Sequence, residues 1–376
     1  MGETKLAVIS DTAVTFREDG TYLGYEPVVK ELEYFSPYFT QLTWMASLHG
    51  KSHTVYSGAL PEDWKIVAMA SIGDKGMNAK LKIIAEFPKI VLQVYKLIKE
   101  STHIHVRAPS HVSFAAIFIS SFFRKKRFWF KYAGSWVDKA PFSYRLQRVL
   151  LNLVAGRNTF VSVNGNWEGY GPNIVTLENP CFSKAQYDLI GNLKYYEENT
   201  RGLRLVYVGS LSEFKGVHLI IDALKQIGFS GYNSFTIIGE GDYSQELRNR
   251  ANGNPKFRFL GSLTKNEVFE ELLAADALII ASATEGFPKV LAEGMMCGCI
   301  PISTDVSCIA QYILEDFGYL IPERSVDGIA ATLKRLVNDS LITEKKRLCH
   351  TNAAIFTYES YESKLKSFFL PEANIY

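Results

Sequence analysis

The chain has 376 residues, of which 47% are hydrophobic and 21% are charged, and its formal net charge is +2 at pH 7. This length suits two domains, and the composition excludes a disordered protein. The small net charge excludes a bulk attraction of the whole chain to nucleic acid. Five cysteines at irregular spacing indicate a reduced compartment and form no zinc-ligand pattern.

Two features bear on the location of the protein. The opening MGETKLAVISD lacks an apolar core long enough for a secretory signal, and the longest nearly apolar run, residues 112–123, is too short to span a bilayer. We therefore expect a cytoplasmic protein. The basic run Arg124–Arg127 lies among aromatic residues, and it is either a contact with the inner face of a membrane or a solvated turn.

The first half of the chain alternates short apolar runs with segments of helical spacing, as a parallel sheet wrapped by helices requires. We expect a long loop over residues 11–24 and a kink at Pro88. The expected strands are 5–10, 42–45, 66–70, 104–106, 128–132 and 160–163, and the expected helices are 27–34, 80–99, 112–123 and 144–154.

Two loops follow expected strands of this half, where ligands bind in open α/β sheets. The first runs from Arg107 to His111, and the second contains Gly134 and Trp136. His111 opens a helix and is interpreted either as a structural residue or as part of a binding site. His103 and His105 are placed on opposite faces of one strand, so that they do not form a chelating pair.

The second half alternates strand and helix strictly. The stretch 187–202 is polar and is interpreted as the linker between domains, and a final helix is expected over 358–369. Thr264 and Glu267 form a capping box. The third glycine of a dinucleotide fingerprint starting at Gly239 falls at Ser244, which disfavours hydride chemistry. The expected strands are 205–208, 235–238, 257–260, 277–280, 300–303 and 319–321.

The stretch from Asp276 to Asp305 predicts a strand, a loop, a helix and a second strand. Pro288 suits a helix start, and Gly298 suits its end. A helix N-terminus attracts phosphate, whereas the flanking carboxylates of Glu285 and Glu293 favour hydroxyl donors. A ligand with central phosphates and hydroxylated rings at both ends, a nucleotide sugar, fits this pattern. The alternative is that both glutamates are ordinary solvated residues.

The segment TEGFPKVLAE resembles the E-x7-E signature of the retaining glycosyltransferases of family four, which have the GT-B fold. LVYVGSLSEFKG, IIGEG and FRFLG resemble three further motifs of that family in the same order, over residues 203–337. The resemblance implies two Rossmann-like parallel-sheet domains facing a central cleft. It assigns 1–190 to acceptor binding, 200–355 to nucleotide-sugar binding and 356–376 to a terminal helix that crosses back.

The resemblance also implies site residues. Lys215 and Glu285 would be catalytic. Donor binding would involve Gly209, Ser210, Lys215, Gly239, Gly261, Gly286, Phe287, Pro288, Lys289 and Glu293, and the acceptor or cleft residues would be Arg107, His111, Gly134, Trp136 and Asn179. The chain departs from the family at Ser210, where an arginine is usual, at Ala133–Gly134, where a histidine is frequent, and at Gln311, where a glutamate is usual.

The implied activity is transfer of a sugar from a nucleotide-diphosphate donor to a hydroxyl of a saccharide or lipid-linked saccharide, with retention, in polysaccharide, lipopolysaccharide or glycolipid assembly. The chain has no Asp-x-Asp triplet, so no metal or other cofactor is expected. Two alternatives stay open: a nucleotide-sugar epimerase of the same fold, and an inactive protein that binds sugar nucleotides.

Overall fold

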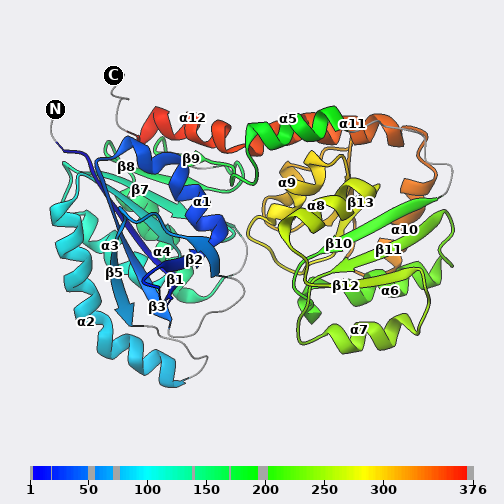
Figure 1. Ribbon diagram of the computed structural model, residues 1–376, viewed down its shortest axis with the longest axis horizontal. Coiled ribbons are helices and arrows are strands. Elements are labelled where there is room, and N and C mark those ends of the chain that lie inside the picture. The colour runs from blue at the N-terminus through cyan, green and yellow to red at the C-terminus, as the bar shows by residue number, and fades with distance from the viewer. Residues whose placement is uncertain are drawn as a thin grey trace. The chain divides into compact units, whose positions relative to one another are not determined.

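The computed structural model describes residues 3–17, 19–49, 56–70, 77–137, 140–168, 171–193 and 202–370. The chain forms two compact units (Figure 1). Unit 1 comprises Met1–Glu178 and Tyr361–Tyr376, and unit 2 comprises Asn179–Ser360. In the described residues, no helix is both long and apolar enough to cross a lipid bilayer.

The sheet of unit 1 is mostly parallel. Its parallel pairs give the order β5-β3-β1-β6-β7-β8-β9, and the antiparallel strands β2 and β4 extend it beside the second half of β1. The strands are β1 (Lys5–Phe16), β2 (Tyr22–Tyr25), β3 (Gln41–His49), β4 (Tyr56–Ala59), β5 (Lys65–Ala70), β6 (His103–Ala108), β7 (Arg127–Tyr132), β8 (Thr159–Val163) and β9 (Ile174–Thr176).

Alternating strand residues of unit 1 point into two separate cores because successive side chains of a strand face opposite sides. One core lies under α2 (Met77–Glu100), α3 (His111–Ser120) and α4 (Phe142–Val154). The other lies under α1 (Glu26–Phe35) and α12 (Tyr358–Phe368). Figure 1 shows the two sets of helices on opposite sides of the sheet. The predicted strands and helices of this half are confirmed, and Pro88 lies inside α2.

Two expectations for unit 1 are wrong. The loop expected over residues 11–24 is a hairpin: β1 continues to Phe16, and Val14 pairs with Gly24 of β2. Gly20 adopts a φ of +90° in the connecting turn, which a glycine tolerates without strain. His103 and His105 share a face because they lie two residues apart, and the fully buried His105 stacks on Trp129 at 3.8 Å between ring centroids.

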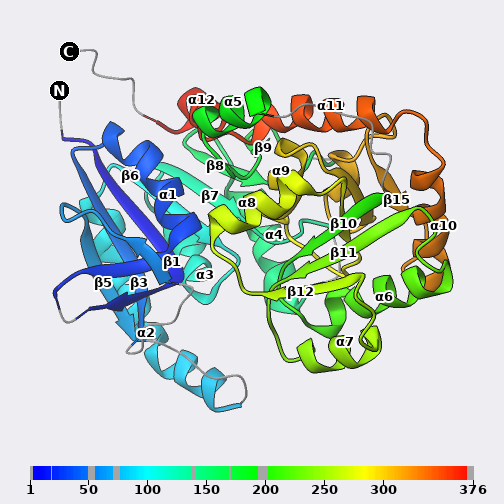
Figure 2. The same cartoon turned by 45° about the vertical axis from the view of Figure 1, so that its right-hand side comes forward.

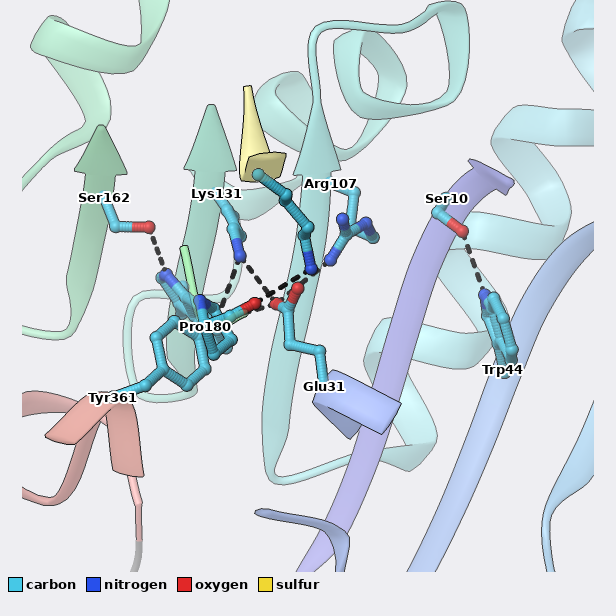
Figure 3. Close-up of polar contacts among 10 residues, drawn as sticks. Ser10, Glu31, Trp44, Arg107, Lys131, Ser162, Pro180 and Tyr361 are labelled. Atoms are coloured by element: carbon cyan, nitrogen blue, oxygen red, sulfur yellow. Dashed lines mark hydrogen bonds and ion pairs between the residues drawn. The ribbon is translucent and has the colours of Figure 1, made fainter. Parts of the chain in front are cut away.

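A charged cluster is buried in the second core (Figure 3). The carboxylate of Glu31, which is 2% exposed, accepts hydrogen bonds from Arg107 at 3.1 Å, Lys131 at 2.8 Å and the Tyr361 hydroxyl at 2.7 Å. Burial alone would raise the pKa of Glu31, but Arg107 and Lys131 together hold it well below its ordinary range. The cluster therefore ties α1, β6, β7 and α12 together.

Unit 2 has a fully parallel sheet in the order β12-β11-β10-β13-β14-β15. The strands are β10 (Leu203–Val208), β11 (Tyr232–Ile238), β12 (Phe257–Gly261), β13 (Ala277–Ile280), β14 (Ile300–Thr304) and β15 (Tyr319–Ile321). The helices are α5 (Lys184–Leu193), α6 (Val217–Gln226), α7 (Ser244–Ala251), α8 (Lys265–Ala274), α9 (Lys289–Met296), α10 (Val326–Val337) and α11 (Ile342–Ala353). Helices α6 and α7 cover one face, and α8 and α9 cover the other (Figures 1 and 2).

Each strand predicted for this half is confirmed, and so is the capping box of Thr264 with Glu267 at the start of α8. The linker expected over residues 187–202 is wrong in its first part, because residues up to Leu193 belong to α5. Tyr187 stacks on His350 at 4.3 Å between ring centroids, so that this polar helix gains its stability from tertiary packing. Residues 194–201 lie outside the described part.

We predict that Glu31→Ala lowers the free energy of unfolding at pH 7 by about 3–5 kcal/mol, because it leaves two buried cations without their carboxylate. Glu26→Ala on the same helix is the control, since its pair with Lys30 is solvent-exposed and contributes about 0–1 kcal/mol. Urea denaturation measures both. Equal losses for the two variants would contradict a structural role of the cluster.

Candidate functional site

The sheet of unit 2 has a topological switch point between β10 and β13, because the chain leaves these neighbouring strands toward opposite edges of the sheet. Ligands of open α/β sheets bind beyond the carboxyl ends of such strands. Lys215 follows β10 in a short 3₁₀ helix (Glu213–Lys215), and Glu285 follows β13. Both predicted catalytic residues therefore lie at the switch point.

Lys215 and Glu285 form an ion pair there. The Lys215 ammonium lies 2.6 Å from Oε1 of Glu285, and their side chains are only 19% and 12% exposed. The Ser282 hydroxyl donates to the same carboxylate oxygen at 2.6 Å. The two loops are also joined by a backbone hydrogen bond from the N–H of Ala283 to the carbonyl of Phe214, at 2.8 Å. The geometry of either loop thus depends on the other.

Two glycines permit close approaches of the backbone at this edge of the sheet, one between the ends of β10 and β11 and one between the loops after β10 and β13. Gly239 has a φ of +130°, and a Cβ atom on it would lie 1.9 Å from the carbonyl oxygen of Gly209. Gly216 has a φ of +74°, and a Cβ there would lie 2.2 Å from the carbonyl oxygen of Ala281. Neither position accepts a larger residue without separating the backbones. The N–H of Gly239 donates to Gly261 at 2.7 Å, so that these predicted positions line the strand ends.

Helix α9 begins as the sequence predicts. Pro288 is its N-cap residue, no side chain caps its first turn, and Gly298 adopts the left-handed conformation just beyond its end. Its unpaired N–H groups form a positive end at the switch point. Gly286 and Phe287 precede this start, and Phe287 packs with its ring centroid 5.1 Å from that of Phe356.

Glu293 of α9 has a side chain that is 16% exposed, with its nearest cation, Lys265, at 3.8 Å. Burial raises the pKa of Glu293, and Lys265 and Lys289 oppose this effect. Lys289, a predicted donor-binding residue, is the first residue of α9. Its ammonium donates to the carbonyl of Pro180 at 2.9 Å in this structure.

Sequence reasoning missed Arg324, which joins the loop of Lys215 to the loop of Glu285. Its guanidinium donates to the carbonyls of Ala281 at 2.9 Å and of Phe214 at 3.2 Å. Arg324 lies between β15 and α10, more than 100 residues after Phe214, and belongs to no motif. Only the tertiary structure reveals it.

Ser210 stands where the family usually has an arginine. Its backbone carbonyl accepts a hydrogen bond from the Tyr207 hydroxyl at 2.8 Å.

In unit 1, Arg107, His111, Gly134 and Trp136 all lie at or just beyond the carboxyl ends of β6 and β7. Arg107 is engaged by Glu31, and the ring of Trp136 packs edge-on against Tyr132 at 5.0 Å. These four predicted residues thus share one edge of the sheet. Asn179 is the first residue of unit 2, and its carbonyl accepts a hydrogen bond from the Cys181 thiol at 3.2 Å.

Asp11 is a second residue that sequence reasoning missed. It lies where the pairing of β1 with β3 shifts register, between Ile9 and Ala13. Burial lowers the pKa of His111, and the neighbouring charge of Asp11 opposes that effect. An acidic residue therefore accompanies His111 at this edge. The sequence pattern does not reveal Asp11, because this residue falls in the segment 11–24 that is expected to be a loop.

We predict that Gly239→Ala lowers the free energy of unfolding by roughly 2–5 kcal/mol, from steric overlap and backbone strain together. Gly253→Ala is the matched control: its φ of +67° brings strain of about 1–2 kcal/mol, but no atom lies within 4 Å of its new Cβ. Thermal and urea unfolding distinguish the two variants. A loss for Gly239→Ala no greater than that for Gly253→Ala would disprove the close approach.

Known proteins resemble the chain in two ways. Residues 193–355 match the family described as Glycosyl transferases group 1. Among curated relatives, the amylovoran biosynthesis glycosyltransferase AmsK of Erwinia amylovora is 34% identical over 158 residues, which are 39% of this chain and 38% of that protein. The chain thus aligns with about two fifths of this relative's length.

Solved structures match nearly the whole chain. Sucrose-phosphate synthase from Thermosynechococcus elongatus aligns with a TM-score of 0.67 and 15% identity, over 97% of this chain and 98% of that one. Anabaena Alr3699/HepE, in complex with UDP and glucose, aligns with a TM-score of 0.63 and 16% identity, over 97% and 98%. These structural matches confirm the predicted GT-B fold, and the match of residues 193–355 to the glycosyl transferases group 1 family lies within unit 2.

Proposed function

We propose that the protein transfers a sugar from a nucleotide-diphosphate donor, bound by unit 2, to a hydroxyl of a saccharide or lipid-linked saccharide, with retention of configuration. The observation that supports this proposal most is the ion pair of Lys215 with Glu285 across the switch point between β10 and β13. It sets a cation and a carboxylate side by side where such sheets bind ligands.

In the proposed reaction, the bond between the anomeric carbon and the diphosphate oxygen breaks, and the acceptor oxygen bonds to that carbon on the same face. The acceptor's proton passes to the departing phosphate oxygen. Negative charge builds up on the diphosphate, and the Lys215 ammonium and the free N–H groups at the start of α9 stabilise it. We propose that no metal ion is needed, because these groups already supply positive charge.

Two carboxylates would hold the donor through its hydroxyls. Glu293 would accept hydrogen bonds from the ribose, since its largely buried carboxylate lies one turn into α9. Glu285, fixed by Lys215 and Ser282, would orient the sugar and offset developing charge at the anomeric carbon. The solved structure of HepE with UDP and glucose supports a nucleotide-sugar donor.

We further propose that the acceptor is bound by unit 1, at the edge that holds Arg107, His111, Gly134 and Trp136. The amylovoran biosynthesis relative supports a role in polysaccharide assembly, with lipopolysaccharide and glycolipid assembly as neighbouring options. Contact with a membrane through Arg124–Arg127 belongs to the same proposal. Within that run, Lys126 is engaged internally, because its ammonium donates to the carbonyls of Lys99 and Ser101.

A panel of nucleotide sugars in thermal-shift assays tests the donor. The true donor at ~100 times its Kd should stabilise the protein by about 2.7 kcal/mol.

Glu293→Ala should raise the donor KM at least as much as it lowers kcat. Burial raises the pKa of Glu293, so the donor KM should rise as the pH falls through that pKa, and Glu293→Gln should abolish this rise. Stabilisation by no nucleotide sugar would exclude the proposal.

We predict that Lys215→Ala lowers kcat on the order of 10²-fold, the effect of removing one donor to a developing oxyanion. The assay is run in excess chelator, which should leave the wild-type rate unchanged. Lys225→Ala in α6 is the control, because this exposed lysine donates to the carbonyl of Arg250 in α7, away from the carboxyl ends of the strands. Near-normal turnover of Lys215→Ala, or strong inhibition by the chelator, would refute this mechanism.

The same assay also tests the alternative activity, because product formed without an acceptor would indicate an epimerase.

A further inference from the structure

The charge of the chain is segregated. From Ser101 to Trp167 it has ten lysines and arginines and one acidic residue, Asp138, which lies outside the described part. This stretch therefore carries a net +9, and the rest of the chain carries −7 within the total of +2. The small overall charge conceals one strongly basic region, and the structure shows where part of it is exposed.

Two connections of unit 1 bring exposed cations together. Helix α3 ends at Ser120 and leads into β7, and α4 ends at Val154 and leads into the adjacent strand β8. Arg124 of the first connection and Arg157 of the second line one groove of about 430 Å³. The Asn158 side chain donates to the carbonyl of Arg124 at 2.9 Å, which fixes the two connections to each other.

Large apolar side chains are exposed around this groove. Phe118 and Phe122 at the end of α3 are 67% and 72% exposed, and their rings contact each other at 5.6 Å between centroids. Leu153, which lines the groove, is 74% exposed, and Val149 one turn before it on α4 is 56% exposed. Exposed phenylalanines beside arginines are unusual on a surface that contacts only water.

We propose that this basic and apolar surface, formed by Phe118, Phe122, Arg124, Leu153 and Arg157, docks unit 1 onto an anionic lipid bilayer. The phenylalanines and Leu153 enter the interface between headgroups and acyl chains, and a lipid phosphate occupies the groove between Arg124 and Arg157. Charge complementarity identifies the occupant, because Arg124 and Arg157 line the groove and no acidic residue is among the described residues that line it.

The docking surface rests on the membrane contact of the proposed function, but it keeps only Arg124 of the basic run that the sequence suggested. Lys126 of that run is engaged by carbonyls, and Arg157, Phe118 and Leu153 come from elsewhere in the chain. It also lies apart from the proposed transfer residues. Helix α3 begins at His111, at the carboxyl edge of the sheet, and its ten residues span about 15 Å to the opposite edge. Substitutions here therefore leave the transfer site intact.

The test is cosedimentation of the full chain with vesicles of phosphatidylcholine alone or mixed with phosphatidylglycerol. We expect binding to the anionic vesicles, weakened as salt rises above about 0.1 M, where the Debye length is ~10 Å. Arg124→Ala combined with Arg157→Ala should lower the partition coefficient about 25-fold, about fivefold for each cation. Phe118→Ser combined with Phe122→Ser should remove the binding that persists at high salt.

The matched control removes two exposed cations of unit 2, by Arg248→Ala combined with Lys334→Ala, and should bind vesicles like the wild type. An equal loss for this control would overturn the proposal, since only net charge would then matter. Equal binding of the wild-type protein to uncharged and anionic vesicles would also overturn the proposal. A fluorescent oligonucleotide is the second probe, and tighter binding to it than to anionic vesicles would identify a nucleic-acid surface instead. Vesicle binding needs no activity, so it stands or falls independently of sugar transfer.

Discussion

The site of unit 2 depends on the ion pair of Lys215 with Glu285. Both side chains are less than a fifth exposed, so their attraction is screened less than that of surface pairs, and loss of either partner leaves a charge without compensation. The pair also keeps each group in position while no donor is bound. In the proposed reaction, the diphosphate of the donor would compete with Glu285 for Lys215, and the Ser282 hydroxyl would still hold the Glu285 carboxylate.

The sequence predicts unit 2 well because parallel strands buried on both faces appear as continuous apolar runs. All four residues of β13 are buried, and the predicted and observed bounds of that strand agree. The glycines of the strand ends are also recognisable, since Gly239 has no space for a side chain beside Gly209. The sequence predicts that Lys215 and Glu285 each follow a strand of this sheet. It does not predict that their side chains form an ion pair.

What the sequence does not predict depends on contacts between distant residues. Strands β2 (YLGY) and β4 (YSGA) each contain a glycine and no continuous apolar run, and so the sequence predicts a loop where β1 and β2 form a hairpin. Glu31 looks like a surface residue of an amphipathic helix, and only Arg107, Lys131 and Tyr361 explain its burial. The role of Arg324 becomes visible only in the structure, through the backbone carbonyls to which its guanidinium donates.

The segregation of charge has a consequence for both proposed ligands. Outside residues 101–167 the chain carries a net −7, so its overall field does not attract an anionic donor to unit 2. Attraction there must come from local groups, namely Lys215 and the uncapped start of α9. An anionic membrane attracts the basic surface of unit 1 and repels the rest of the chain. In the two proposals, the same charge distribution would therefore make donor binding local and determine which face of unit 1 meets the lipid.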